Sequence, residues 1–124
     1  MDKLHSSWNQ IGPGDKILFK RGDEWAPHGI GSRLGMLTLP NRMAGTRGNP
    51  IVIGAYGNSN NPKPIISGEN ITESGKYLIW SGAMEWVEFR DFHVIKGNCS
   101  TSAFFLRADY SLSMGLSHIT LHNI

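Results

Sequence analysis

The stretch Gly48-Asn-Pro-Ile-Val-Ile-Gly-Ala-Tyr-Gly57 and the stretch Pro64-Ile-Ile-Ser-Gly68 together indicate the fold class of this chain. Each contains a short β-branched apolar run that is closed by glycine, and Asn, Ser and Pro residues join the two at positions 58–63. Such runs are typical of strands, and such connectors are typical of turns. Apolar residues recur at every second position from Ile51 to Ala55, which is the period of a strand and not of a helix.

The rest of the chain repeats this order of short strand, sharp corner and short strand. Fifteen glycines and six prolines supply the corners, and only residues 1–10 could hold a turn of helix. Residues 22–35 and 41–49 are predicted to be loops. Further strands are predicted over residues 15–20, 36–39, 77–80, 86–95, 103–108 and 118–124. A length of 124 residues indicates a single all-β domain, residues 1–124, in which residues 1–14 could form a partial cap.

Composition and charge narrow the function classes. The chain is 40% apolar and 18% charged, as expected of an ordered globular protein. A net charge of only +2 gives no electrostatic reason to expect nucleic-acid binding. No apolar run approaches the roughly 18 residues of a membrane span, and the first residues lack the apolar region of a signal peptide. Cys99 is the single cysteine, so no intrachain disulfide can form and the compartment stays open.

Two segments share one pattern of apolar and polar residues. Val87-Glu-Phe-Arg-Asp-Phe92 and Ile119-Thr-Leu-His-Asn-Ile124 lie 32 residues apart. In both, two successive polar residues break the strand alternation, and the second of them is Asp91 or Asn123. Asp and Asn are the non-glycine residues that best tolerate left-handed backbone angles. We therefore predict a corner at each position, after which the strand restarts with its apolar side still inward.

Repetition at the length of one supersecondary unit indicates a solenoid of stacked coils. Equivalent residues would lie roughly 4.8 Å apart, the spacing of neighbouring strands. The following inward residues are predicted to be buried: Ile17, Phe19, Ile51, Ile53, Val87, Phe89, Ile119 and Leu121. The alternative fold is an antiparallel β-sandwich with hairpins, which is less favoured because the Asn-Gly and Asp-Gly hairpin signals are scarce.

Three stretches carry a resemblance to a known family: Pro13-Gly-Asp-Lys-Ile-Leu-Phe-Lys-Arg-Gly22 with Trp25, residues 48–57, and Lys63-Pro-Ile-Ile-Ser-Gly68. Together they resemble the amino-terminal coils of pectate-lyase-like right-handed parallel β-helices. The resemblance implies a short right-handed parallel β-helix, truncated relative to family members, which are often secreted. It implies no single activity, because the family includes polysaccharide lyases, hydrolases and epimerases as well as phage adhesins.

The predicted phase turns one group of polar side chains outward on adjacent coils. The resemblance implies that an Arg or Lys could abstract a sugar proton while Ca²⁺ neutralises the uronate. The candidate catalytic residues are Arg90, His93 and His122, and the candidate substrate-binding residues are Glu88, Lys96 and Thr120. The plainer alternative is a solvated polar face. The four tryptophans could stack on sugars if exposed, although buried packing is favoured.

A calcium site has little support from the sequence. Ca²⁺ takes about six to eight oxygen ligands, several of them from carboxylates. Here Glu88 is predicted to stack on Thr120 and Asp91 on Asn123, so no two acidic side chains converge. We therefore predict neither a metal site nor a cofactor.

Two function hypotheses follow. The favoured one is a non-catalytic β-helix module that self-assembles and could bind glycans. The alternative is a small carbohydrate-active enzyme, a lyase or hydrolase, that acts on an acidic polysaccharide. Uncovered β-helix ends recruit other chains, so a homo-oligomer is expected, most simply a two-fold dimer that shields Ile119, Leu121 and Ile124. A polysaccharide is the other expected partner, and neither nucleic acid nor a membrane is expected.

Overall fold

The computed structural model describes residues 8–97, 102–108 and 115–124. These residues form eleven β-strands and one short 3₁₀ turn, η1 (Trp8–Gln10), with no α-helix among them. None of the described segments contains a helix long and apolar enough to cross a membrane. The chain is therefore all-β, as predicted, while Cys99 lies outside the described residues.

The strands form three sheets. The first contains β1 (Lys16–Lys20), β5 (Ile51–Tyr56), β8 (Ala83–Arg90) and β11 (Leu116–His122), in that order, with β4 (Arg42–Ala44) beside the first half of β8. The second contains β2 (Glu24–Trp25), β6 (Ile65–Ser67) and β9 (His93–Ile95). The third contains β3 (Gly35–Thr38), β7 (Tyr77–Ser81) and β10 (Ser102–Leu106).

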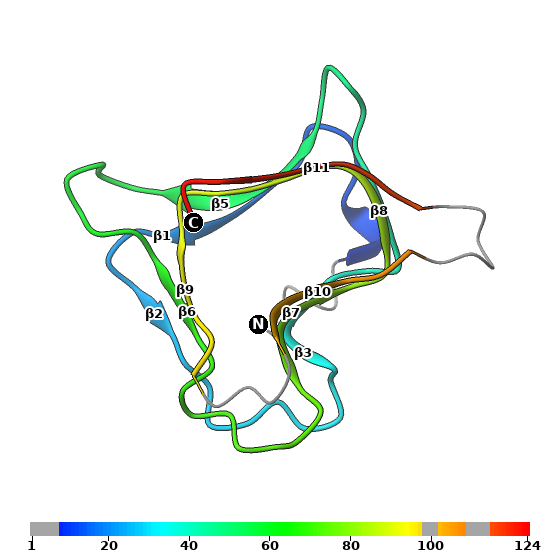
Figure 1. Cartoon of the computed structure of the whole chain (residues 1–124). Helices are drawn as coiled ribbons and strands as arrows, with labels where there is room; N and C mark the ends of the chain where they lie inside the picture. Colours follow the sequence, from blue (N-terminus) through cyan, green and yellow to red (C-terminus); the bar gives the residue numbers. More distant parts are fainter. Residues whose placement is uncertain (1–7, 98–101, 109–114) are drawn as a thin grey trace.

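All pairs between these strands are parallel. The chain visits the first, second and third sheets in turn and then returns to the first. In Figure 1 the sheets form three sides of one outline, and the strands of successive passes overlie one another. Antiparallel pairing within the described segments is confined to the isolated bridge between Thr46 and Asn49. The alternative of an antiparallel β-sandwich is therefore wrong.

The predicted 32-residue repeat is confirmed by the register of β8 and β11. Val87 pairs with Ile119, and Phe89 pairs with Leu121. The two predicted corners also have left-handed backbones, with φ of 63° at Asp91 and 56° at Asn123. The Asn123 Nδ2 donates a hydrogen bond of 2.8 Å to the Asp91 Oδ1, so the two corners stack as a polar ladder.

A second corner precedes the first one in each copy and was not predicted. Trp86 and His118 have φ of 52° and 53°, and their rings stack with centroids 3.7 Å apart and planes 7° apart. Met84 and Val87 are both buried, so Glu85 and Trp86 together interrupt the alternation. The chain thus bends at Trp86 while the apolar side of β8 stays inward on both sides of the bend.

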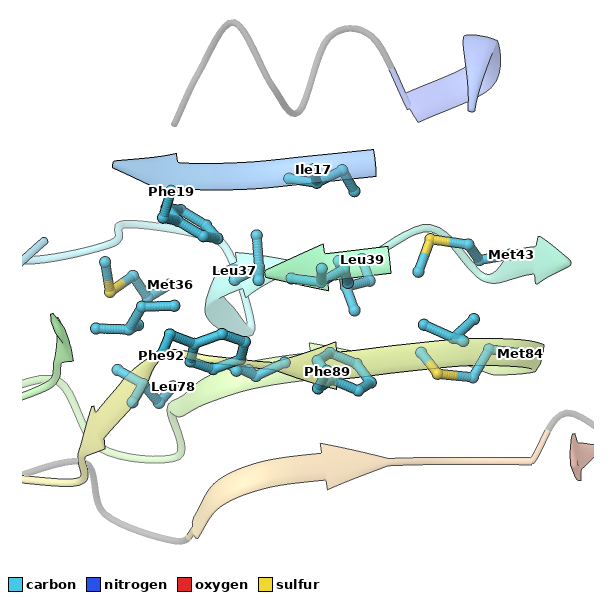
Figure 2. Packing of buried hydrophobic residues seen from close by; sticks show 14 of the residues in the cluster. Ile17, Phe19, Met36, Leu37, Leu39, Met43, Leu78, Met84, Phe89 and Phe92 are labelled. Carbon is cyan, nitrogen blue, oxygen red and sulfur yellow. The ribbon is translucent and has the colours of Figure 1, made fainter. Parts of the chain in front are cut away.

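The core lies between the three sheets. Six of the eight residues predicted to be buried are buried: Ile17, Phe19, Ile51, Ile53, Val87 and Phe89. Figure 2 shows how β3 and the following segment add Met36, Leu37 and Leu39 to this core. Full burial of one such side chain contributes about 1.5–3 kcal/mol, so these rows are the main source of stability.

Burial of Leu121 was predicted and is wrong, and Ile119 is only partly buried. Phe89 has β5 on one side and β11 on the other, whereas β11 pairs only with β8 among the described strands. Since Leu121 is in register with Phe89, its direction was predicted correctly. It is exposed because no described strand covers it.

Candidate functional site

Four of the predicted site residues lie together on the outer face of the first sheet. The register places Glu88 beside Thr120 and Arg90 beside His122. Thr120 and His122 are exposed, while Glu88 and Arg90 are half-buried. Glu88 and Arg90 point outward because they alternate along β8 with Val87 and Phe89, whose side chains are buried.

Arg90 is held between two carboxylates. Its Nη1 lies 3.4 Å from the Glu88 Oε2, and its Nε lies 4.0 Å from the Asp91 Oδ2. A Cβ at Gly54 would lie 3.3 Å from the Arg90 carbonyl oxygen, which is a tight contact, so glycine eases the approach of β5 to β8 at Arg90. A guanidinium that is engaged by two neighbouring carboxylates is held in place by them, whereas a proton-abstracting base must be free to approach the proton of its substrate. The geometry therefore suits an ion pair better than a catalytic base.

His93 and Lys96 do not join these residues. The corner at Asp91 leads the chain from the first sheet into the second, where His93 begins β9 in register with Ile65. There His93 lines a separate, open hollow of about 280 Å³ together with Pro62, Lys63, Ile65 and Ile95. Lys96 follows β9 and is exposed. The predicted catalytic set is thus divided between two faces of the molecule (Figure 1).

A recess of about 210 Å³ lies next to Glu88 and Thr120, at the Trp86 corner. Its lining contains the polar and aromatic residues Arg47, Trp86, Glu88, His118 and Thr120, together with the apolar residues Pro50 and Ile119. Of these, Glu88 and Thr120 were predicted as site residues and Trp86 only as one of four possible sugar-stacking residues. The part missed is Arg47 and His118. The signal for His118 was present, because Glu85-Trp86 and Ser117-His118 extend the 32-residue repeat backward.

The loop between β4 and β5 forms one side of the recess and projects from the outline in Figure 1. Its base is fixed by a hydrogen bond of 2.9 Å from the Gly45 N–H to the Glu85 carbonyl oxygen. Gly45 must be glycine, since a Cβ there would lie 2.6 Å from the Trp86 carbonyl oxygen. In the next pass a single residue, Trp86, replaces this whole loop. The recess lies where the long loop of one pass, with Arg47 and Pro50, meets the single-residue corner at Trp86 in the next pass.

Metal ligands are not gathered at either hollow. Across residues 8–97, 102–108 and 115–124, no three His, Cys, Asp or Glu side chains lie close enough to hold a metal ion. The expectation that no metal or cofactor binds stays a prediction.

The comparisons with known proteins do not assign this chain to a family. No family model matches the chain, and no curated protein matches it significantly.

Proposed function

We propose that the chain is a short right-handed parallel β-helix of the pectate-lyase-like kind, and that it acts as a non-catalytic module. In this proposal it assembles with a second copy of itself and binds glycans on its outer face. The β-helix is supported by three parallel sheets visited in a constant order and by stacked corners at Asp91 and Asn123. The handedness agrees with the strong preference of parallel crossover connections.

The observation that carries the assembly proposal is a difference in exposure between two residues in register. Phe89 is 0% exposed, and its partner Leu121 in β11 is 50% exposed. Ile124 and Leu116 at the same end are also exposed. An edge strand with open hydrogen-bonding groups and an apolar row beneath it recruits further strands. A second copy that meets this edge with its own β11 would bury the same residues on both chains.

The absence of catalysis is supported by the electrostatics of the outer face. Arg90 is paired with Glu88 and Asp91, and His93 and Lys96 lie on another face. The alternative, an enzyme that acts on an acidic polysaccharide, has one observation in its favour, namely that Arg90 and His122 are direct neighbours. A depolymerisation assay separates the two. We expect no ultraviolet-absorbing unsaturated uronate product from pectate-type polysaccharides, with or without Ca²⁺, and formation of such a product would favour the enzyme.

Size exclusion coupled to light scattering tests the assembly. We expect the unmodified chain to be a dimer at micromolar concentration. Leu121→Glu should be monomeric, because it places a charge in the apolar row of the interface. His122→Glu is the matched control, since it adds the same charge one residue away on the outward face, and it should stay dimeric. A wild-type monomer at high micromolar concentration would contradict the proposal.

A further inference from the structure

The recess at the Trp86 corner has the composition of a small ligand site. We propose that it binds a single, uncharged pyranose ring of a glycan. This inference rests on the proposed glycan binding and adds its location and the class of sugar. The residues that carry it are Arg47, Trp86, Glu88, His118 and Thr120.

The aromatic wall of the recess is held in place before any ligand arrives. The ring of Trp86 is stacked on His118 at 3.7 Å and 7°. Its backbone is bent at φ of 52°, and this bend belongs to the paired strand β8 rather than to an isolated loop. A fixed indole loses little conformational freedom when a ligand binds, which favours affinity. The C–H groups on one face of a sugar ring are apolar, and they can pack against the apolar face of an aromatic ring such as this indole.

The polar groups around the recess complement hydroxyl groups. Arg47 can only donate hydrogen bonds, Glu88 as a carboxylate can only accept them, and Thr120 can do both. Glu88 is oriented by Arg90, whose Nη1 contacts one carboxylate oxygen at 3.4 Å. Hydroxyl groups both donate and accept, so a polyol satisfies all three side chains at once.

The charge and the size of the recess limit the ligand further. Arg47 would attract a ligand carboxylate and Glu88 would repel it, so neither an acidic nor a basic sugar gains a clear electrostatic advantage. The volume of about 210 Å³ is smaller than the sites of drug-sized ligands, which are about 300–1,000 Å³. One neutral ring fits this description better than an oligosaccharide buried along its length.

Nitrogen–proton NMR spectra of the full chain provide the test. The probes are neutral methyl glycosides (methyl gluco-, galacto- and mannopyranoside) and the matched methyl glucuronide, each at millimolar concentration. We expect at least one neutral glycoside to shift the Trp86 indole signal and the amide signals of Arg47 and Thr120. The glucuronide should shift them no more than the neutral probes do.

Three variants connect these shifts to the recess. Trp86→Gly removes the ring, while glycine accepts the positive φ without strain, and it should weaken binding about tenfold through loss of one aromatic contact. Glu88→Gln keeps the shape of the recess and should also weaken binding. Trp80→Phe on β7, which does not line the recess, is the control and should bind as the wild type does.

The outcomes separate this inference from the proposed function. If a glycoside binds but Trp86→Gly and Glu88→Gln bind it equally well, the recess is wrong while glycan binding stands. If only the glucuronide binds at the recess, the proposal that the sugar is uncharged is wrong. If no probe shifts these signals, the inference fails, and a polysaccharide pull-down with the same chain then decides whether glycan binding fails with it.

Discussion

The two ends of the first sheet are both edge strands, yet they differ in how well they are covered. In β1, Ile17 and Phe19 are 8% and 4% exposed, whereas Leu121 in β11 is 50% exposed. The strands themselves are similar, since each has apolar residues at alternate positions on its inward side, Ile17 and Phe19 in β1 and Ile119 and Leu121 in β11. The difference lies beyond them. Ile11 packs against the core, and η1 lies on the side of β1 away from β5 (Figure 2).

This contrast shows that alternation in a strand determines which way a side chain points, but not whether it is buried. Burial at an edge depends on what lies next to that edge. The partial cap expected over residues 1–14 stays a prediction, and residues 1–7 lie outside the described segments. Ile11 packs against the core at the β1 end of the sheet. No described strand plays this part for β11.

The largest effect is expected from a change in the middle of the stack. Phe89 is enclosed and meets Phe104 edge-on with ring centroids 5.6 Å apart. Phe89→Ala should lower the free energy of unfolding by about 3–5 kcal/mol, as for other large-to-small core changes. Leu121→Ala, measured at a dilution where the chain is monomeric, should cost only about 1 kcal/mol, because half of that side chain is already in water. Equal losses in denaturant titrations would contradict the difference between the two positions.

A change at the covered end should make that end resemble the open one. Ile11→Ser removes an apolar side chain that packs against the core and should cost about 1–2 kcal/mol, less than a fully buried site because Ile11 is only partly buried. It should also give species larger than a dimer in light scattering, since both ends would then be open to other chains. Gln10→Ser, at the exposed neighbouring position, should change neither property. Dimers alone from Ile11→Ser would argue against a capping role.

A smaller effect is expected from acid, at a contact between two loops. The Glu73 Oε1 accepts hydrogen bonds from the backbone N–H of Ile30 at 2.9 Å and of Gly31 at 3.2 Å. The pKa of Glu73 is held below its ordinary value of 4.5, mainly by the hydrogen bond from the Ile30 N–H. Other backbone N–H groups and the charge of Lys76 lower this pKa further. A carboxyl whose folded pKa is lowered stabilises the fold above its unfolded pKa, and this contribution is lost as the pH falls through the folded pKa.

The free energy of unfolding should therefore decline below about pH 4.5 in the wild type and decline less steeply in Glu73→Gln. Asn70→Ala, on the same loop, serves as the control. It removes the hydrogen bond of 3.2 Å from the Asn70 Nδ2 to the Ala26 carbonyl oxygen but no titratable group, so it should keep the wild-type pH dependence. Denaturant titrations at several acidic pH values measure both. Identical pH profiles for the wild type and Glu73→Gln would remove Glu73 as the cause.

Much of the fold follows from local sequence. The corners at Asp91 and Asn123 were predictable because these residue types tolerate a left-handed backbone. The corner at Trp86 was not, because a bulky residue rarely adopts positive φ, and here it does so with its ring stacked on that of His118. Without that corner, nothing marked the equivalent one at His118. The strands β2 and β4 lie in stretches predicted as loops, since strands of two and three residues carry too little alternation to be detected.

The candidate site divides in the same way. The proximity of Glu88 to Thr120 and of Arg90 to His122 could be predicted, because equivalent positions of a repeat stack in register. The separation of His93 from Arg90 could not, because it depends on how far the chain turns at Asp91. The position of Arg47 in the recess could not be predicted either, because its loop occurs in only one pass of the chain and has no equivalent in the repeat.

Residue-resolved amide hydrogen exchange over a series of protein concentrations tests the difference between the two ends most directly. We expect the amides of β1 to exchange slowly at every concentration. The β11 amides that point away from β8 should exchange fast when the chain is dilute and become protected as the dimer forms. Protection of these β11 amides that does not change with concentration, or its absence at all concentrations, would contradict the proposal that the chain self-associates through β11.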